Sequence, residues 1–127
     1  MTRLAFALGL AILSGSPALS QTDDDRTLAF GCNDLVIVGR MTNGDYHTVE
    51  DPEDILGLGW IDATLSVRQV IRGKETRSVL PVRYFAHTYM WDDGDFMLVL
   101  SPEADGVAII RTGQLMSAHP KLAARCE

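Results

Sequence analysis

Residues 60–72 alternate between apolar and polar side chains more regularly than any other segment of the chain. A period of two places successive side chains on opposite faces of a strand, so this segment predicts a strand with one buried face. The side chains expected to face the interior are Ile61, Ala63, Leu65 and Val67. Val70 and Ile71 are both apolar, so we expect a bulge near Gln69 before a turn at residues 72–75.

Four further segments predict strands. Residues 34–41 are rich in β-branched side chains and apolar on both faces, so both faces could be covered. Residues 78–90 alternate again, and Pro81 places the start of this strand, or a sheet edge, at that point. The side chains expected on its inner face are Leu80, Val82, Tyr84, Ala86 and Met90. Residues 96–100 and 107–111 are short apolar runs bounded by turn signals.

The remaining segments after residue 20 predict connections. Residues 21–31 predict a flexible leader, because residues 21–26 hold three consecutive aspartates and no apolar pattern. Order is expected to begin near residues 27–32. Residues 42–58 predict a long polar connection, in which residues 46–49 could form a short strand and 52–56 one helical turn. Residues 114–124 could begin a short helix, although a proline within them limits its length.

Five strands and little helix predict an all-β fold. The pattern favours a small five-stranded OB-like barrel with at most a short C-terminal helix. A β-sandwich is the alternative, but it usually has about seven strands. Residues 32–127 would form this single barrel domain, since their number is close to the common domain size.

The first twenty residues have the order of features that a signal peptidase recognises. Arg3 supplies a positive charge, residues 4–13 form an apolar run, and small residues stand one and three positions before Gln21. The run is too short to cross a membrane, which takes about 20 apolar residues. We therefore expect residues 1–20 to be a signal peptide, the rest to have no transmembrane span, and the location to be periplasmic or secreted.

Cys32 and Cys126 are the two cysteines of the chain and lie near the two ends of the predicted domain. In an oxidising compartment the simplest expectation is one disulfide that joins them. A closed loop of this length contributes about 4–5 kcal/mol in the chain-entropy account. Two free or intermolecular thiols are the alternative.

The net charge of the chain limits the classes of partner that we expect. It has 11 basic and 17 acidic residues, and its net charge is −6. Nucleic-acid binding depends on basic side chains, and anionic membranes attract basic segments, so neither is an expected partner. Five carboxylates between Asp45 and Asp54 could bind Ca²⁺ or a basic partner. Their spacing does not fit a calcium-binding loop, so a solvated loop is the simpler interpretation.

Aromatic side chains gather between residues 84 and 96, close to an arginine and a histidine. Aromatic residues beside arginine are common in binding hot spots, whereas strand alternation also directs some of them into the core. If they form a recognition surface, the residues expected on it are Arg83, Phe85, His87, Tyr89 and Trp91.

His87 also suggests a different chemistry, because Asp92, Asp93 and Asp95 follow it. A histidine with carboxylates could bind a metal or transfer a proton, but a metal site needs three or more convergent donors. The chain has no nucleophile-elbow motif and no glycine-rich phosphate loop. We therefore expect no cofactor, no metal ligand and no catalytic residue, and keep an enzyme or metal protein centred on His87 as the alternative.

Three segments in this order resemble the netrin-like domains: residues 32–40 (CNDLVIVGR), 65–74 (LSVRQVIRGK) and 96–102 (FMLVLSP). Those domains share an OB-type barrel with the tissue inhibitors of metalloproteinases, and the chain is also similar to exported bacterial proteins of unassigned function. The resemblance implies a barrel. In the inhibitors the first mature residue is a cysteine that binds the target's zinc, whereas Cys32 lies inside this chain. The resemblance therefore does not imply the inhibitory mechanism.

Together these features predict an exported, non-enzymatic binding or interaction module of the cell envelope, with a protein or peptide as its possible partner. A structural envelope protein without a discrete site is a further alternative.

Overall fold

The computed structural model describes residues 26–126. The predicted signal peptide and the first residues of the predicted leader lie outside this range. In chain order the elements are β1 (Thr27–Phe30), β2 (Leu35–Thr48), β3 (Gly59–Arg72), β4 (Val79–Ala86), β5 (Asp95–Ser101), β6 (Ala108–Leu115), the 3₁₀ helix η2 (Met116–Ala118) and β7 (Lys121–Ala124).

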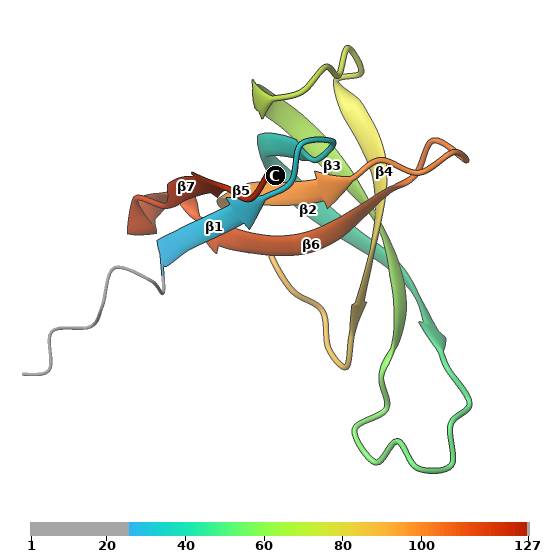
Figure 1. The fold of residues 1–127 in the computed structure, drawn as a ribbon. Helices are drawn as coiled ribbons and strands as arrows, with labels where there is room; N and C mark the ends of the chain where they lie inside the picture. The colour runs from blue at the N-terminus through green and yellow to red at the C-terminus, as the bar shows by residue number, and fades with distance from the viewer. Residues whose placement is uncertain (1–25, 127) are drawn as a thin grey trace, which may run out of the picture.

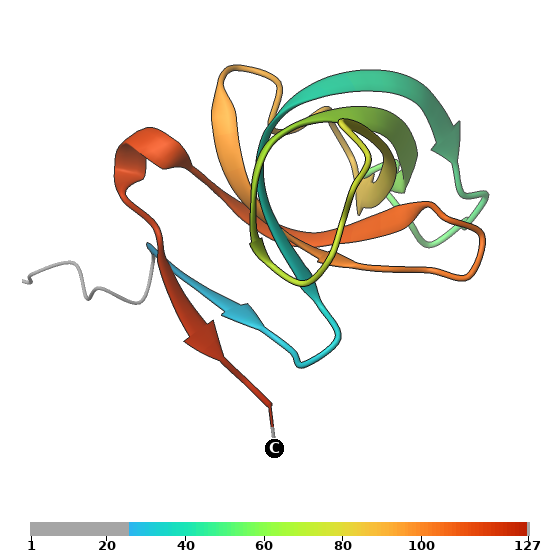
Figure 2. The same cartoon turned by 90° about the horizontal axis from the view of Figure 1, so that it is seen from above.

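Five of these strands close into a barrel in the order β2-β3-β4-β6-β5. Neighbouring strands are antiparallel except β4 and β6, which are parallel and pair at Val82–Ala108 and Arg83–Ile109. Figure 1 shows the barrel from the side, and Figure 2 shows the strands curving around its interior. The predicted all-β fold with a small five-stranded OB-like barrel is confirmed, and η2 is the short helical turn near its C-terminal end.

The barrel interior holds the side chains that the alternation pattern predicted. From β3 and β4 the buried residues are Ile61, Ala63, Leu65, Leu80, Val82, Tyr84 and Ala86, with Val67 partly buried against them. Met90 is instead 39% exposed, because β4 ends at Ala86 and the alternation ends with it. Period-two patterning therefore predicts the core correctly only as far as the strand extends.

The predicted connection at residues 42–58 is wrong for residues 42–45, whereas the possible strand at residues 46–49 is present as far as Thr48. β2 continues through them to Thr48 and stays paired with β3, with a bulge between Asn43 and Tyr46. Asn-Gly-Asp is a turn sequence, but pairing with the strongly patterned β3 outweighs this local preference. The connection between β2 and β3 is thus only residues 49–58, and it projects from the end of the barrel (Figure 1).

Close approach of β2 to β3 depends on a glycine near the middle of β2. A Cβ atom added to Gly39 would lie 2.5 Å from the Ser66 carbonyl oxygen and 2.8 Å from Cδ1 of Leu65. A side chain at this position would push the two strands apart, because these neighbours are backbone and core. Gly39 therefore permits the tight pairing that lets these long strands curve around the barrel.

Strand β1 lies at the end of the predicted leader, where order was expected to begin, but a strand at residues 27–30 was not predicted. β1 pairs in parallel with β7, and the pair covers the outside of the barrel. The buried side chain of Leu28 packs there with Val36, Val38 and Val99. This second cluster explains why β2 is apolar on both faces.

The expectation of a helix over residues 114–124 is also mostly wrong. β6 continues to Leu115, the single turn of η2 follows, and β7 then begins at Lys121. The predicted disulfide is confirmed: Cys32 and Cys126 are bonded, with Cα atoms 5.1 Å apart. It ties the end of β1 to the end of β7, and the Arg125 amide donates a 2.8 Å hydrogen bond to the Phe30 carbonyl beside it.

Within residues 26–126, no helix combines the length and the apolar character needed to cross a membrane.

Candidate binding surface

Exposed apolar side chains gather at one end of the barrel. The described part of the chain has seven exposed large hydrophobic residues: Val49, Ile55, Leu56, Val79, Phe85, Tyr89 and Met90. Six of them lie in the β2–β3 connection or at and just after the end of β4, and Val79 is alone at the other end of β4. Single exposed apolar residues are ordinary, but a cluster of them marks an interaction site. We call the region formed by residues 44–60 and 84–91 the hairpin end.

An aromatic pair forms the strand part of the hairpin end. Trp60 on β3 stands opposite Phe85 on β4, and their ring centroids are 5.2 Å apart with tilted planes. The alternation of both strands directs these side chains to the outside of the barrel, where Phe85 is 46% exposed. Paired strands hold the two rings in a fixed relative position, so little side-chain freedom remains to be lost on binding.

Two tyrosines connect the loops of the hairpin end. The hydroxyl of Tyr89 donates a 3.0 Å hydrogen bond to the carbonyl of Gly44 on β2. The hydroxyl of Tyr46 donates to the carbonyl of Gly57 in the β2–β3 connection. Tyr46 and Tyr89 also line a shallow cavity of about 390 Å³ together with His87 and Thr88. The two connections are therefore joined through β2 rather than independent.

An ionic network lies on the strands beside the hairpin end. Asp62 on β3 accepts a 2.7 Å hydrogen bond from Nε of Arg83 and lies 2.8 Å from Nε2 of His47. The hydrogen bond from Arg83 lowers the pKa of Asp62, and Asp62 in turn raises the pKa of Arg83. Arg83 is thus already paired, so it is not a free cation for a partner.

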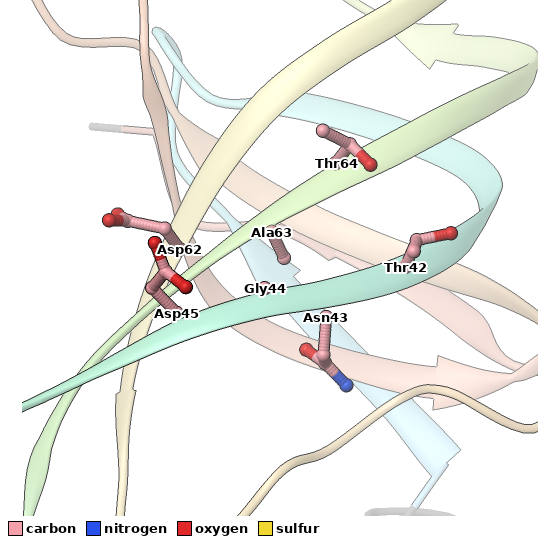
Figure 3. A pocket seen from close by; sticks show the side chains of 7 residues that line it. All are labelled: Thr42, Asn43, Gly44, Asp45, Asp62, Ala63 and Thr64. Carbon is pink, nitrogen blue, oxygen red and sulfur yellow. The ribbon is translucent and has the colours of Figure 1, made fainter.

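A depression of about 310 Å³ adjoins this network on the outer side of β2 and β3 (Figure 3). Its lining residues are Thr42, Asn43, Gly44, Asp45, Asp62, Ala63 and Thr64. Figure 3 shows Asp45 and Asp62 toward one end of the depression, with the side chains of Thr42 and Thr64 farther along the strands. Oxygen atoms that line the depression can accept hydrogen bonds from a ligand. The two carboxylate oxygens of Asp62, however, already have His47 and Arg83 as hydrogen-bond partners.

The five residues predicted as a recognition surface separate into two groups. Arg83 and Phe85 are on the outer side of β4, and His87 and Tyr89 are exposed in the connection that follows it. Trp91 turns the other way and packs edge-on against the buried Tyr84, with ring centroids 4.9 Å apart. Its backbone has a φ of 57°, in the left-handed region that bulky residues rarely adopt. Trp91 therefore closes the end of the barrel core.

Three surface residues were missed by the sequence reasoning. Trp60 is the partner of Phe85, and Ile55 and Leu56 are the most exposed apolar residues of the hairpin end. The signal for the last two was present, because two adjacent large aliphatic residues inside an acidic, proline- and glycine-containing loop have no core to fill. The signal for Trp60 was its outward position in the alternation.

His87 is exposed in the connection after β4, which also contains Asp92 and Asp93. Among residues 26–126, no group of three or more histidine, cysteine, aspartate or glutamate side chains is arranged to hold a metal ion. What the hairpin end offers chemically is apolar contact, aromatic faces and hydrogen-bonding groups.

Comparisons of the chain with protein-family models, with curated proteins and with solved structures find no match. The resemblance to netrin-like domains stays a prediction. Function is therefore inferred from the surface itself.

The ionic network gives a first testable prediction. The pKa of Asp62 should lie below its ordinary value of 3.8, and Arg83→Gln should raise it, because the guanidinium supplies the largest lowering effect. Carboxyl carbon shifts followed by NMR during an acid titration measure this pKa directly. Since the folded pKa is lowered, the network stabilises the fold above about pH 4 and loses this contribution as the pH falls. Arg77→Gln, at a separate ion pair with Glu75, is the control and should leave Asp62 unchanged. If the pKa of Asp62 is the same in Arg83→Gln as in wild type, the prediction is contradicted.

Proposed function

We propose that this protein is an exported, non-enzymatic binding module of the cell envelope that recognises a protein or peptide through its hairpin end. The observation that carries the proposal is the concentration of six of the seven exposed large hydrophobic residues at this end. Exposed aromatic side chains in fixed positions are typical anchors of binding hot spots, because they bury a large area and lose little entropy.

Two observations support the exported location. The sequence begins with the features of a signal peptide, and Cys32 and Cys126 form a disulfide. Disulfides persist in the periplasm and outside the cell, and are rare in the reducing cytosol. The excess of acidic residues disfavours nucleic acid as the partner and favours a neutral or basic protein.

The proposal predicts that Phe85→Ala/Tyr89→Ala weakens partner binding. A partner is first captured on the immobilised protein from a cell-envelope extract of the source organism, identified by mass spectrometry and purified. Its affinity for wild type and variant is then measured by calorimetry. We expect at least a tenfold loss, because truncation of hot-spot aromatic residues typically costs about 1–2 kcal/mol or more.

Val79→Ala is the matched control for this experiment. Val79 is an exposed apolar residue on the same strand but at the opposite end of β4, so its truncation should leave the affinity unchanged. Circular dichroism checks that each variant keeps its strands. Equal affinity of wild type and a folded Phe85→Ala/Tyr89→Ala variant for the partner would overturn the proposal. An equal loss of affinity in the Val79→Ala control would overturn it as well.

A further inference from the structure

The tip of the β2–β3 connection presents two aliphatic side chains to solvent. Ile55 is 93% exposed and Leu56 is 63% exposed, and neither belongs to a core cluster. Complete transfer of such side chains out of water is favourable by about 1.5–3 kcal/mol each, so burial of these exposed surfaces by a partner would contribute to binding. Figure 1 shows this connection extending beyond the barrel, where a partner can reach it.

Hydrogen bonds within the connection fix how it presents these side chains. The carboxylate of Asp54 accepts hydrogen bonds from the amide of Leu56 at 2.9 Å and the amide of Leu58 at 2.7 Å. The carboxylate of Asp51 accepts one from the amide of Glu53, also at 2.9 Å. The loop therefore has a defined conformation that points its apolar pair outward, which reduces the ordering cost of binding.

The charge around the apolar pair is uniformly negative. Glu50, Asp51, Glu53 and Asp54 all lie in the connection, and the chain has no lysine or arginine between Arg40 and Arg68. A second stretch without lysine or arginine, residues 84–110, supplies the rest of the hairpin end. The nearest arginine on the paired strands is Arg83, which is bonded to Asp62. Neither of these two stretches of sequence thus supplies a lysine or arginine that could neutralise the loop carboxylates.

We propose that the 49–58 connection docks a basic, amphipathic segment of the partner protein. Apolar side chains of that segment contact Ile55 and Leu56, and its lysine or arginine side chains face the surrounding carboxylates. This inference rests on the proposed function and specifies the chemistry of the partner. Charge complementarity favours a basic segment as the occupant, since opposite potentials across an interface speed association and disfavour wrong partners.

The same charges disfavour the two other occupants of an exposed aliphatic pair. A bacterial or plasma-membrane surface with anionic lipids repels four carboxylates next to the inserting residues. A second copy of this chain would bring two identical acidic loops together, and such like-charge contacts cost several kcal/mol. Both occupants are therefore outcomes that the experiment distinguishes.

The test uses a fluorescent peptide of alternating lysine and leucine as the probe, with the purified protein titrated into it. Matched peptides of alternating glutamate and leucine, and of lysine and serine, separate charge from apolar contact. We expect the lysine–leucine peptide to bind at least about tenfold tighter than either control peptide, and its affinity to fall as salt is raised.

Two variants assign the binding to the loop. Ile55→Ser/Leu56→Ser removes the apolar pair, and Glu50→Gln/Asp51→Asn/Glu53→Gln removes charge while keeping Asp54 and the acceptor oxygen at residue 51. Each should weaken peptide binding about tenfold, and the second should also reduce the salt dependence. The control is Glu103→Gln/Asp105→Asn in the β5–β6 connection, another acidic loop, which should have no effect.

Several results would overturn the inference. Equal binding by the loop variants, or an equal loss in the Glu103→Gln/Asp105→Asn control, would show non-specific charge attraction. Binding to phosphatidylcholine–phosphatidylglycerol vesicles that depends on Ile55 and Leu56 would indicate a membrane, and a dimer in sedimentation that depends on them would indicate self-association. If Phe85→Ala/Tyr89→Ala weakens binding of the captured partner but both loop variants bind it with wild-type affinity, this inference fails and the proposed function stands. If Phe85→Ala/Tyr89→Ala also binds the partner with wild-type affinity, the proposed function fails.

Discussion

Replacement of both cysteines, Cys32→Ser/Cys126→Ser, is expected to lower the free energy of unfolding by about 4 kcal/mol. The bond closes a loop with a sequence separation of 94, so it removes much conformational freedom from the unfolded chain. It also ties β1 to β7, which pair over only four residues and form a two-stranded sheet outside the barrel. Such a small sheet is marginal without a cross-link. Urea unfolding of variant and wild type measures the difference.

Reduced wild-type protein is the natural comparison, since it lacks the bond but keeps both side chains. It should unfold at nearly the same urea concentration as the serine variant. Hydrogen exchange should show the first loss of protection at Leu28 and Leu122, which face each other across β1 and β7, while the barrel strands stay protected. A difference below about 1 kcal/mol would show that the bond has little effect on the unfolded chain. Early exchange in β3 would contradict the expected order of opening.

The parts of the fold that could be predicted are those with a local signal. The faces of β3 and β4 follow from period-two alternation, because one side of each strand fills the barrel and the other meets solvent. The second half of β2 could not be predicted, since Asn43, Gly44 and Asp45 favour a turn unless a long neighbouring strand pairs with them. Strand β1 was missed for a related reason. Its partner, β7, lies more than ninety residues away along the chain, and a four-residue segment has no pattern of its own.

The candidate surface was predictable only in part. Phe85 is outward because of its place on β4, and Tyr89 is exposed just beyond it, but the same alternation wrongly extends to Trp91. Trp91 turns inward because its backbone adopts a positive φ, a conformation that bulky residues rarely take and that no residue type at this position signals. Loop residues such as Ile55 carry no periodicity, so their exposure follows only from where the neighbouring strands end.

Tyr84→Ala is expected to destabilise the fold by about 3–5 kcal/mol, the range for removal of a buried aromatic side chain. Tyr84 is the largest of the fully buried side chains and packs against Trp91 at the end of the core. Tyr84→Phe keeps the ring and should cost about 1–3 kcal/mol, because it removes only the hydroxyl. Urea unfolding separates the two contributions. If both variants lose the same free energy of unfolding, the hydroxyl accounts for the whole effect, and packing of the ring contributes nothing.

The hydroxyl of Tyr84 links the core to the binding surface. It donates a 2.6 Å hydrogen bond to Oδ1 of Asn43 and accepts one of 2.9 Å from the amide of Met90. Nδ2 of Asn43 donates in turn to the Met90 carbonyl at 3.1 Å, so the Tyr84 hydroxyl and the Asn43 side chain together fix the residue next to Tyr89. Tyr84→Phe should therefore increase hydrogen exchange at residues 87–91 and weaken partner binding, although residue 84 itself is buried.

Alkaline pH tests the same hydroxyl by titration. Burial raises the pKa of Tyr84, so the folded protein keeps the neutral phenol at a pH where the unfolded chain has begun to ionise. The contribution of Tyr84 is fully present below about pH 10 and decreases as the pH rises through its folded pKa. Wild type should therefore lose more stability between about pH 9 and pH 11 than Tyr84→Phe does. If Tyr84→Phe keeps the wild-type pH dependence, the phenol is not protected by the fold, and the proposed link between the core and the hairpin end fails with it.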